Sequence, residues 1–424
     1  MQKEHLIPVK QWYEPFLKAT LFCLIAVYFV NCLSPLRLHV DTLRYFAVKD
    51  CIEFGCPPDS FAATDYLPYG YTALLIFLSK IGLLKSVSII LINCFYLFAG
   101  LWFVKKFFKL SSPLLILLVI TNWTIIKFVT HPLSEMQYLF FSMGSLYFFY
   151  KYKTNKKILD LLVAFIFAVI TFITRTVGVT LIGALALGVV WEYRKQLIEF
   201  FRKNIIWAIS LFVVIVGVAI FSKQLGLNHY TGVFTKQFDE GLGISKMLEW
   251  HFTEWSELFL NTSSVKVLPY LPGSSGAVIF VIVGIALFAG FLYLLVFRKN
   301  NIPFYIKAYI LFYSLLMFNW PFYDPRFWVP ILPLIIGVIM QASFSKHKVV
   351  KWIMSLYLAA YLIMGVISIG YMTYTSLNKK VFARTQANGA YRNEYETIFY
   401  GTPQSDTAQY VNPATLDVLK RYNK

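Results

Sequence analysis

The chain has 424 residues with the composition of an integral membrane protein, which excludes an ordinary soluble domain. Apolar residues make up 58% of it and charged residues only 14%, whereas about a quarter of a soluble domain is charged. The net charge is +18, but the basic residues sit in short loops between apolar runs and form no basic stripe. This distribution argues against a nucleic-acid partner.

Apolar runs long enough to cross about 30 Å of hydrocarbon as helices recur along the chain. The first follows the basic segment Met1–Lys18, exceeds a cleaved signal sequence in length and lacks a small-residue cleavage site, so we expect a retained signal anchor. The fold class predicted is all-α, a polytopic transmembrane helix bundle of about eleven spans. The spans are residues 16–34, 86–104, 112–130, 134–150, 158–174, 176–191, 204–222, 276–297, 302–320, 327–341 and 350–374.

The run Tyr66–Leu84 is ambiguous, because it is apolar yet contains Pro68, Gly70 and Lys80. We interpret it as an interfacial helix on the outer surface, since the later loops then obey the positive-inside rule. With this topology the inner segments hold 19 lysines and arginines against 4 acidic residues, and the outer segments are nearly balanced. The amino terminus is then cytoplasmic and the carboxyl terminus outside. The inner segments are residues 1–18, 105–110, 151–157, 192–204, 298–301 and 345–351.

This topology divides the chain into a transmembrane module, residues 1–374, and an extracytoplasmic tail, residues 375–424. Two outer loops of the module, residues 35–85 and 223–275, are large enough to carry function. The second is aromatic and acidic, and either forms one or two amphipathic helices at the interface or is an ordinary solvated loop. In the first, Cys51 and Cys56 are spaced to close a small disulfide loop in an oxidising compartment.

Ionisable residues at membrane depth are candidate site residues, because leaving each one buried without a partner is costly. Eight such residues are far apart in sequence, yet the predicted topology places all of them at the outer ends of the helices. They are Asp41, Arg44, Lys127, His131, Glu135, Arg175, Asp324 and Arg326.

Each candidate also has a purely structural interpretation. Asp41 is placed either to act as a general base or to cap the helix that follows it. Glu135 is expected at the positive end of a helix that Ser134 begins. Arg175 and Lys127 either snorkel to the membrane surface or hold an anionic group, for which a guanidinium is well suited.

The segment Asn319–Pro333 contains four prolines in about a dozen residues, which are expected to break the helix. Asp324 and Arg326 lie within this break. Irregular backbone at that depth is tolerated only where it meets protein or a wet cavity. Asp324 and Arg326 either pair with each other or take part in a site.

In their order along residues 16–341, these segments resemble the C-type (GT-C) membrane glycosyltransferases, a group that includes protein O-mannosyltransferases and aminoarabinose transferases. Each motif is short, and the resemblance rests on their order and spacing. The motifs are Asp41-x-x-Arg-Tyr, Leu67-Pro-Tyr-Gly-Tyr, His131-Pro-Leu-Ser-Glu, Ile173-Thr-Arg-x-x-Gly and Asp324-Pro-Arg-Phe-Trp-Val-Pro-Ile-Leu-Pro.

The resemblance implies GT-C-like outer loops and an inverting transferase in the cytoplasmic membrane, with an extracytoplasmic site and a polyprenyl-phosphate-linked sugar as donor. On this analogy Asp41 is the catalytic base, and Arg175, Lys127 and Arg326 bind the donor phosphate. Its partners would be membrane lipids and a glycan, lipid or protein acceptor. Some family members carry Asp-Glu where this chain has Asp41-Thr42, so we expect no cofactor, with a divalent metal (Mg or Mn) left open. Four further substrate-binding residues are expected: Arg44, His131, Glu135 and Asp324.

Two other functions remain open on the sequence. An envelope polysaccharide polymerase or ligase is also a basic multi-span protein, but the outer loops lack the expected Arg-x-x-x-Gly signature. A transporter or flippase would carry ionisable residues near the bilayer midplane and an internal repeat, and the sequence shows neither pattern.

Overall fold

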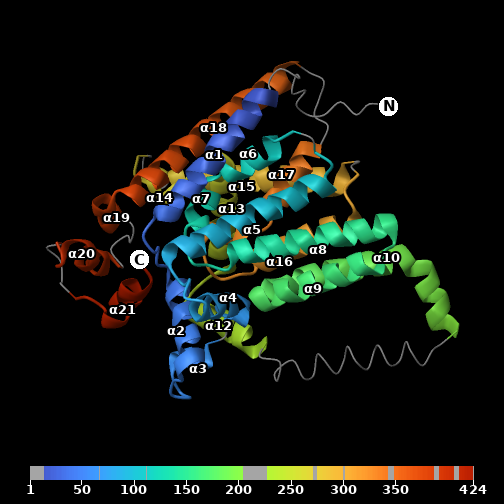
Figure 1. The fold of residues 1–424 in the computed structure, drawn as a ribbon. Coiled ribbons are helices and arrows are strands. Elements are labelled where there is room, and N and C mark those ends of the chain that lie inside the picture. The colour runs from blue at the N-terminus through green and yellow to red at the C-terminus, as the bar shows by residue number, and fades with distance from the viewer. Residues whose placement is uncertain are drawn as a thin grey trace.

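The computed structural model is helical throughout the part of the chain that it describes (Figure 1). It describes residues 14–65, 67–110, 112–203, 227–270, 275–298, 301–341, 348–385, 391–404 and 410–423. No strand occurs among these residues, in agreement with the all-α fold class.

Five helical segments in the described ranges are long and apolar enough to cross a membrane: Glu14–Leu33, Ser86–Phe107, Thr176–Gln196, Gly276–Phe297 and Val349–Leu377. Much of their apolar surface is not covered by protein; Phe22 is 74% exposed and Trp352 is 72% exposed. Apolar surface of this extent is costly in water and suits contact with lipid chains. The chain is therefore a membrane protein.

In the first half of the chain, three helices pack side by side. Interlocking aromatic side chains, including Phe103, Phe140 and Phe167, join α5, α8 and α9 into one layer. The bounds are α1 Glu14–Val30, η2 Asn31–Leu33, α2 Val40–Phe54, α3 Phe61–Thr64, α4 Tyr69–Lys80, α5 Ser86–Phe107, α6 Leu114–Ile120, α7 Trp123–Val129, α8 Glu135–Asn155, α9 Ile158–Thr174, η3 Thr176–Gly178 and α10 Val179–Lys203.

In the second half, α13 packs along α15 around the buried Trp255, while α16 packs against α10. The bounds are α12 Leu227–Asp239, α13 Ile244–Leu260, α14 Ser264–Val267, η5 Leu268–Tyr270, α15 Ser275–Leu292 with a wider turn η6 Tyr293–Phe297, α16 Phe304–Phe318, η7 Pro325–Trp328, α17 Leu332–Gln341, α18 Lys348–Leu377, α19 Lys379–Thr385, α20 Arg392–Tyr400 and α21 Pro413–Tyr422.

Five of the expected spans in the described ranges are not among the segments of spanning length and hydropathy: 112–130, 134–150, 158–174, 302–320 and 327–341. The helices at 158–174 and 302–320 have only 17 and 15 residues. The run 112–130 is broken at Asn122, whose side chain accepts the backbone N–H of Thr124 and so begins a second short helix. The run 327–341 contains only ten residues of α-helix, because Pro325–Trp328 forms a separate tight turn before it. The expected span 204–222 lies outside the described residues.

The region Tyr66–Leu84 contains α4, a helix of twelve residues, which is too short to cross the hydrocarbon core. Its start lies against the end of α9. A side-chain carbon at Gly70 would come within 2.8 Å of the backbone nitrogen of Thr174, so only glycine permits this approach. The tight turn expected between α9 and α10 is present as η3.

The loop after α2 is closed by a disulfide between Cys51 and Cys56, whose Cα atoms are 4.9 Å apart. The prediction that these two cysteines pair is confirmed. The bridge ties the last turn of α2 to the loop that leads to α3.

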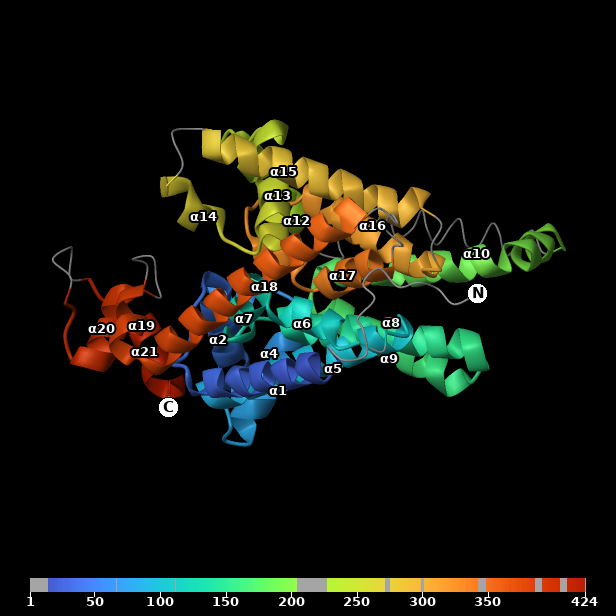
Figure 2. The same cartoon turned by 90° about the horizontal axis from the view of Figure 1, so that it is seen from above.

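The short helices α19, α20 and α21 form a compact group at one end of the molecule, beyond the carboxyl end of α18 (Figure 2). A core of Phe382, Tyr395 and Phe399 joins α19 to α20. The described part of the tail is therefore folded against the module.

The topology predicts which loops face the cytoplasm, and cysteine labelling measures it. In a Cys23→Ser background, Lys106→Cys and Tyr270→Cys each place one thiol at an exposed position, on the inner and outer side respectively. In intact cells, a membrane-impermeant maleimide should modify position 270 and should reach position 106 only after permeabilisation. Labelling of position 106 from outside would reverse the topology.

Candidate functional site

The site begins where the chain leaves η2 and runs in an extended conformation to α2. His39 is the N-cap of α2, and its Nδ1 atom accepts the backbone N–H of Asp41 at 3.2 Å. The alternative in which Asp41 caps this helix is therefore wrong. Asp41 instead lies in the first turn, where the positive helix end favours a carboxylate.

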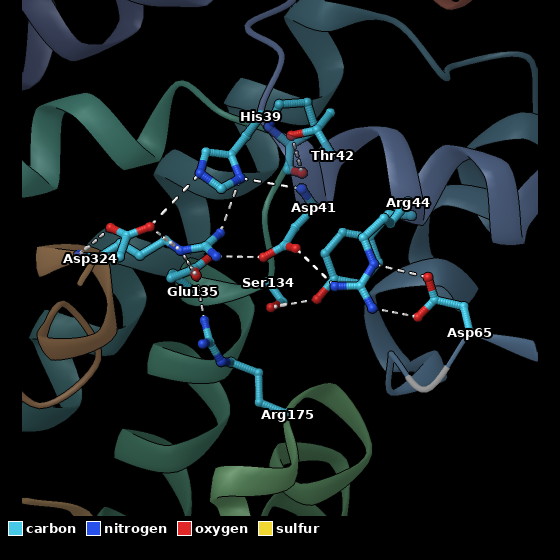
Figure 3. A network of polar contacts seen from close by, with 12 residues as sticks. His39, Asp41, Thr42, Arg44, Asp65, Ser134, Glu135, Arg175 and Asp324 are labelled. Carbon is cyan, nitrogen blue, oxygen red and sulfur yellow. Dashed lines mark hydrogen bonds and ion pairs between the residues drawn. The ribbon is translucent and has the colours of Figure 1, made fainter. Parts of the chain in front are cut away.

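Asp41 forms two ion pairs. Its Oδ2 atom accepts a hydrogen bond from Arg326 at 2.5 Å, and its Oδ1 atom accepts one from Arg44 at 3.1 Å (Figure 3). Arg44 also donates two hydrogen bonds, of 2.9 and 2.7 Å, to Asp65. Because a two-pronged pair of this kind fixes the guanidinium plane, Arg44 is oriented by Asp65 and presents its third nitrogen, Nη1, to Asp41.

Arg326 comes from the proline-rich break between α16 and α17. Its Nε atom lies 2.7 Å from Oδ2 of Asp324 and 3.8 Å from Oε1 of Glu135. Asp324 in turn accepts the backbone N–H of Arg326 at 3.0 Å, which caps η7. Asp324 and Arg326 therefore pair with each other, and Arg326 also takes part in the cluster.

Glu135 and Arg175 form a further ion pair of the cluster. Glu135 starts α8, Arg175 follows the last residue of α9, and the two side chains form an ion pair (Figure 3). The Glu135 side chain is only 2% exposed. Arg175 is therefore paired with a buried carboxylate and does not snorkel to the surface. Ser134 is the N-cap residue of α8, as expected, but its side chain forms no capping hydrogen bond; its hydroxyl accepts one from Tyr45.

Buried acids of α13 hold the proline-rich segment in place. The carboxylate of Glu254 accepts the backbone N–H of Asp324 at 2.6 Å and the indole N–H of Trp328 at 2.7 Å, and it contacts His251. Glu257 accepts the hydroxyl of Tyr323 at 2.7 Å. The segment 223–275 thus contains an amphipathic helix, α13, whose buried acids support the backbone of the site.

The cluster is layered by accessibility. The side chains of His39, Asp41 and Asp324 are 29%, 21% and 19% exposed, whereas those of Arg326 and Glu135 are 7% and 2% exposed. The side chains of Arg175 and Arg44 are 17% and 15% exposed, so the accessible groups are two carboxylates, an imidazole and, slightly less exposed, these two guanidinium groups. The guanidinium of Arg326 lies beneath them.

The charges around Asp41 keep it ionised. Burial alone would raise its pKa, but the opposing effect of Arg326, with Arg44, lowers the pKa of Asp41 to about 2. For His39, burial and the charge of Arg326 lower the pKa below its usual value. A neutral His39 agrees with its Nδ1 atom acting as an acceptor.

Lys127 and His131 stand apart from this network. The ammonium of Lys127 lies 5.5 and 4.8 Å from the ring centres of Trp123 and Phe128, and it forms no ion pair with any residue that the structure describes. His131 is 3% exposed, and its Nδ1 atom bonds the carbonyl of Lys127, so it serves the turn between α7 and α8.

Of the eight candidate residues, six meet in one connected network: Asp41, Arg44, Glu135, Arg175, Asp324 and Arg326. Sequence reasoning missed three members or supports, His39, Asp65 and Glu254. His39 precedes the helix by one residue, and an N-cap position was a usable signal. Asp65 pairs with Arg44, and Glu254 binds the segment around Asp324. Nothing in the sequence near Asp65 or Glu254 indicates these contacts.

Within the described ranges, no group of three or more histidine, cysteine, aspartate or glutamate side chains is arranged to hold a metal ion. Whether the protein uses a metal stays a prediction. Comparisons with models of protein families, with curated proteins and with solved structures find no match.

The pair of Arg175 and Glu135 makes a stability prediction. Arg175→Ala leaves a buried carboxylate without its closest cation, which should cost about 3–5 kcal/mol. Thermal unfolding of the purified protein measures this loss. The double variant Arg175→Met/Glu135→Gln should recover much of it. Lys153→Ala, which breaks a half-exposed pair with Glu192, should cost less than about 1 kcal/mol. An equally small loss in Arg175→Ala would contradict the pairing.

Proposed function

We propose that the protein is a membrane glycosyltransferase that moves a sugar from a polyprenyl-phosphate donor to an acceptor hydroxyl on the outer face of the membrane. One observation carries the proposal. An ionised and accessible carboxylate, Asp41, is held between the guanidinium groups of Arg44 and Arg326 at one end of apolar helices, the end that the predicted topology places outside. A lipid-linked sugar carries its anionic phosphate at that level of the membrane, so base and cations are where the donor would present its reactive bond.

In the proposed reaction the acceptor oxygen attacks the anomeric carbon, and the bond from that carbon to the phosphate oxygen breaks. Polyprenyl phosphate leaves with the bonding electron pair, and the acceptor proton passes to Asp41. A cation beside the leaving phosphate stabilises the charge that develops on it. Inversion at the sugar carbon follows from attack opposite the leaving group.

A carboxylate with a pKa of about 2 is a weak base, because the most effective base titrates near the working pH. The arrangement suggests how this is overcome. When the donor phosphate attracts Arg326, Asp41 loses its strongest ionic partner and its pKa rises. Under this proposal, donor binding and activation of the base are coupled through the same guanidinium.

The charge balance identifies the cation that is free to meet the donor. Four carboxylates, those of Asp41, Asp65, Glu135 and Asp324, face three guanidinium groups, so the ionised cluster has one excess negative charge. An entering phosphate therefore needs a further cation. We assign this part to Lys127, which has no acidic partner among the described residues and whose ammonium lies against the rings of Trp123 and Phe128.

Arg175 has a different proposed part. Its guanidinium is committed to the buried carboxylate of Glu135, although the Arg175 side chain itself is 17% exposed. It therefore acts on the donor through Glu135 and Arg326, as a positioning residue. The alternative functions, a polysaccharide polymerase or ligase and a flippase, would also bind a lipid-linked phosphate.

They differ from the proposed transferase in the reaction: a polymerase or ligase joins whole chains, and a flippase transfers no sugar.

The first test concerns Asp41. Asp41→Asn keeps the size of the side chain but removes its ability to accept a proton, so transfer should fall by about 10²–10⁴-fold. Proteoliposomes are incubated with tritiated polyprenyl-phosphate mannose, glucose or arabinose and membranes that supply acceptors, and released polyprenyl phosphate is measured. Asp59→Asn, the same change at an exposed position of the same outer loop, is the control. Full activity in Asp41→Asn would defeat the assignment of the base.

The second test concerns Lys127. Lys127→Ala removes one charge-assisted contact of about 1.5–3 kcal/mol, so the protein should bind polyprenyl phosphate about 10- to 100-fold more weakly. Binding is followed by the thermal stabilisation of the purified protein as polyprenyl phosphate is added. Lys127→Arg should retain most of the affinity, and Lys80→Ala, an exposed outer lysine, should retain all of it. Unchanged affinity in Lys127→Ala would remove Lys127 from the donor site.

A further inference from the structure

The short segment that leads into the site lacks backbone partners of its own. Leu36 and Leu38 lie in the extended stretch between η2 and α2, and both are almost fully buried. Neither forms a backbone-to-backbone hydrogen bond. Buried backbone groups need partners, so something else must supply them.

The tail supplies these partners through Tyr395 of α20. The Tyr395 hydroxyl donates a hydrogen bond to the carbonyl of Leu36 at 2.7 Å and accepts the N–H of Leu38 at 2.8 Å. One hydroxyl therefore satisfies both the carbonyl of Leu36 and the N–H of Leu38. Leu38 lies one residue before His39 and three before Asp41. Tyr395 is fully buried, with its ring packed edge-on against Phe382 of α19.

A second tail residue completes the bonding. The N–H of Leu36 donates to Oδ1 of Asn423, at the end of α21, at 2.8 Å. The neighbouring Arg37 is 1% exposed; it donates to Ser376 at the end of α18 and lies over the ring of Phe382. The segment is thus enclosed by tail residues on several sides.

The tail also holds α2 on the far side of Asp41. Tyr422 of α21 stacks on Phe46, with ring centres 4.7 Å apart, and its hydroxyl accepts a hydrogen bond from Lys49 at 2.9 Å. Arg421 reaches Asp50 at 2.9 Å. The tail therefore contacts the chain before and after the site residues, although more than 340 residues separate them in sequence.

From this arrangement we infer that Tyr395 and Asn423 are positioning residues, which fix the extended segment 35–39 so that His39 and Asp41 meet Arg326. The inference rests on the proposed transferase function for its kinetic consequence. The tail then contributes to catalysis by holding the segment that carries His39 and Asp41 in place. A small displacement of a catalytic group is enough to cost about 10²-fold in rate.

Two pairs of variants test the inference in the full-length protein. Tyr395→Phe removes only the hydroxyl and keeps the ring; Tyr400→Phe makes the same change on the same helix, where the hydroxyl bonds only Lys380, at 3.4 Å. Asn423→Ala removes the acceptor of the Leu36 N–H, whereas Asn423→Asp keeps an acceptor oxygen. Hydrogen–deuterium exchange is measured for the peptides 36–43 and 324–331, with α5 as an internal reference. The steady-state constants for transfer are measured in parallel.

We expect Tyr395→Phe and Asn423→Ala to raise exchange in both peptides and to lower kcat by about 10- to 100-fold, with KM for the donor nearly unchanged. Tyr400→Phe should behave as the wild type, and Asn423→Asp should recover most of the rate. Faster exchange with unchanged kcat would show a purely structural contact and overturn the inference.

Failure of the proposed function gives a different result. If the wild type transfers no sugar from any of the three donors, exchange alone decides. A rise in both peptides then supports the positioning of the segment against Arg326. A rise confined to residues 36–43, or no rise, overturns it.

Discussion

The guanidinium of Arg326 is the point at which three distant parts of the chain meet. It contacts Asp324 beside it in η7, Asp41 from the start of α2 and, more distantly, Glu135 from the start of α8. A positive charge that is almost completely buried is stable only with such partners. The requirement to pair it therefore fixes the relative positions of η7 and the starts of α2 and α8, and the accessible carboxylates beside it follow from the same requirement.

Supporting layers surround this contact. Glu254 of α13 holds the backbone of the proline-rich segment, and Asp65 orients Arg44. The tail closes the backbone of the segment before His39. In each case a polar group from outside the cluster satisfies a buried donor or acceptor, and each such contact would be costly to lose. The site is thus built from several segments, none of which could hold its geometry alone.

The placement of the cluster at one end of apolar helices sets what it can meet. Water-soluble molecules and the headgroups of membrane lipids can both reach a cluster at the end of such helices. A cluster at the bilayer midplane would be out of reach of water-soluble molecules. Under the proposed function, the coupling between Asp41 and Arg326 keeps the base inactive until an anion competes for the guanidinium. This gives a physical reason for a carboxylate with so low a pKa at the proposed reaction centre.

Local chemistry in the sequence determined the helical class, the membrane character, the short α4 and the disulfide of Cys51 with Cys56. Hydrophobic run length, loop charge and cysteine spacing are readable without long-range contacts. The same reasoning collected six residues that meet in the network, because an ionisable residue near an apolar helix end stands out. Tertiary structure alone decided the break at Asn122, the pairing of Arg44 with Asp65, the isolation of Lys127 and the docking of Tyr395 on Leu36. These depend on which buried groups find partners across the fold, and pairing energies between residues hundreds of positions apart leave no local pattern in the sequence.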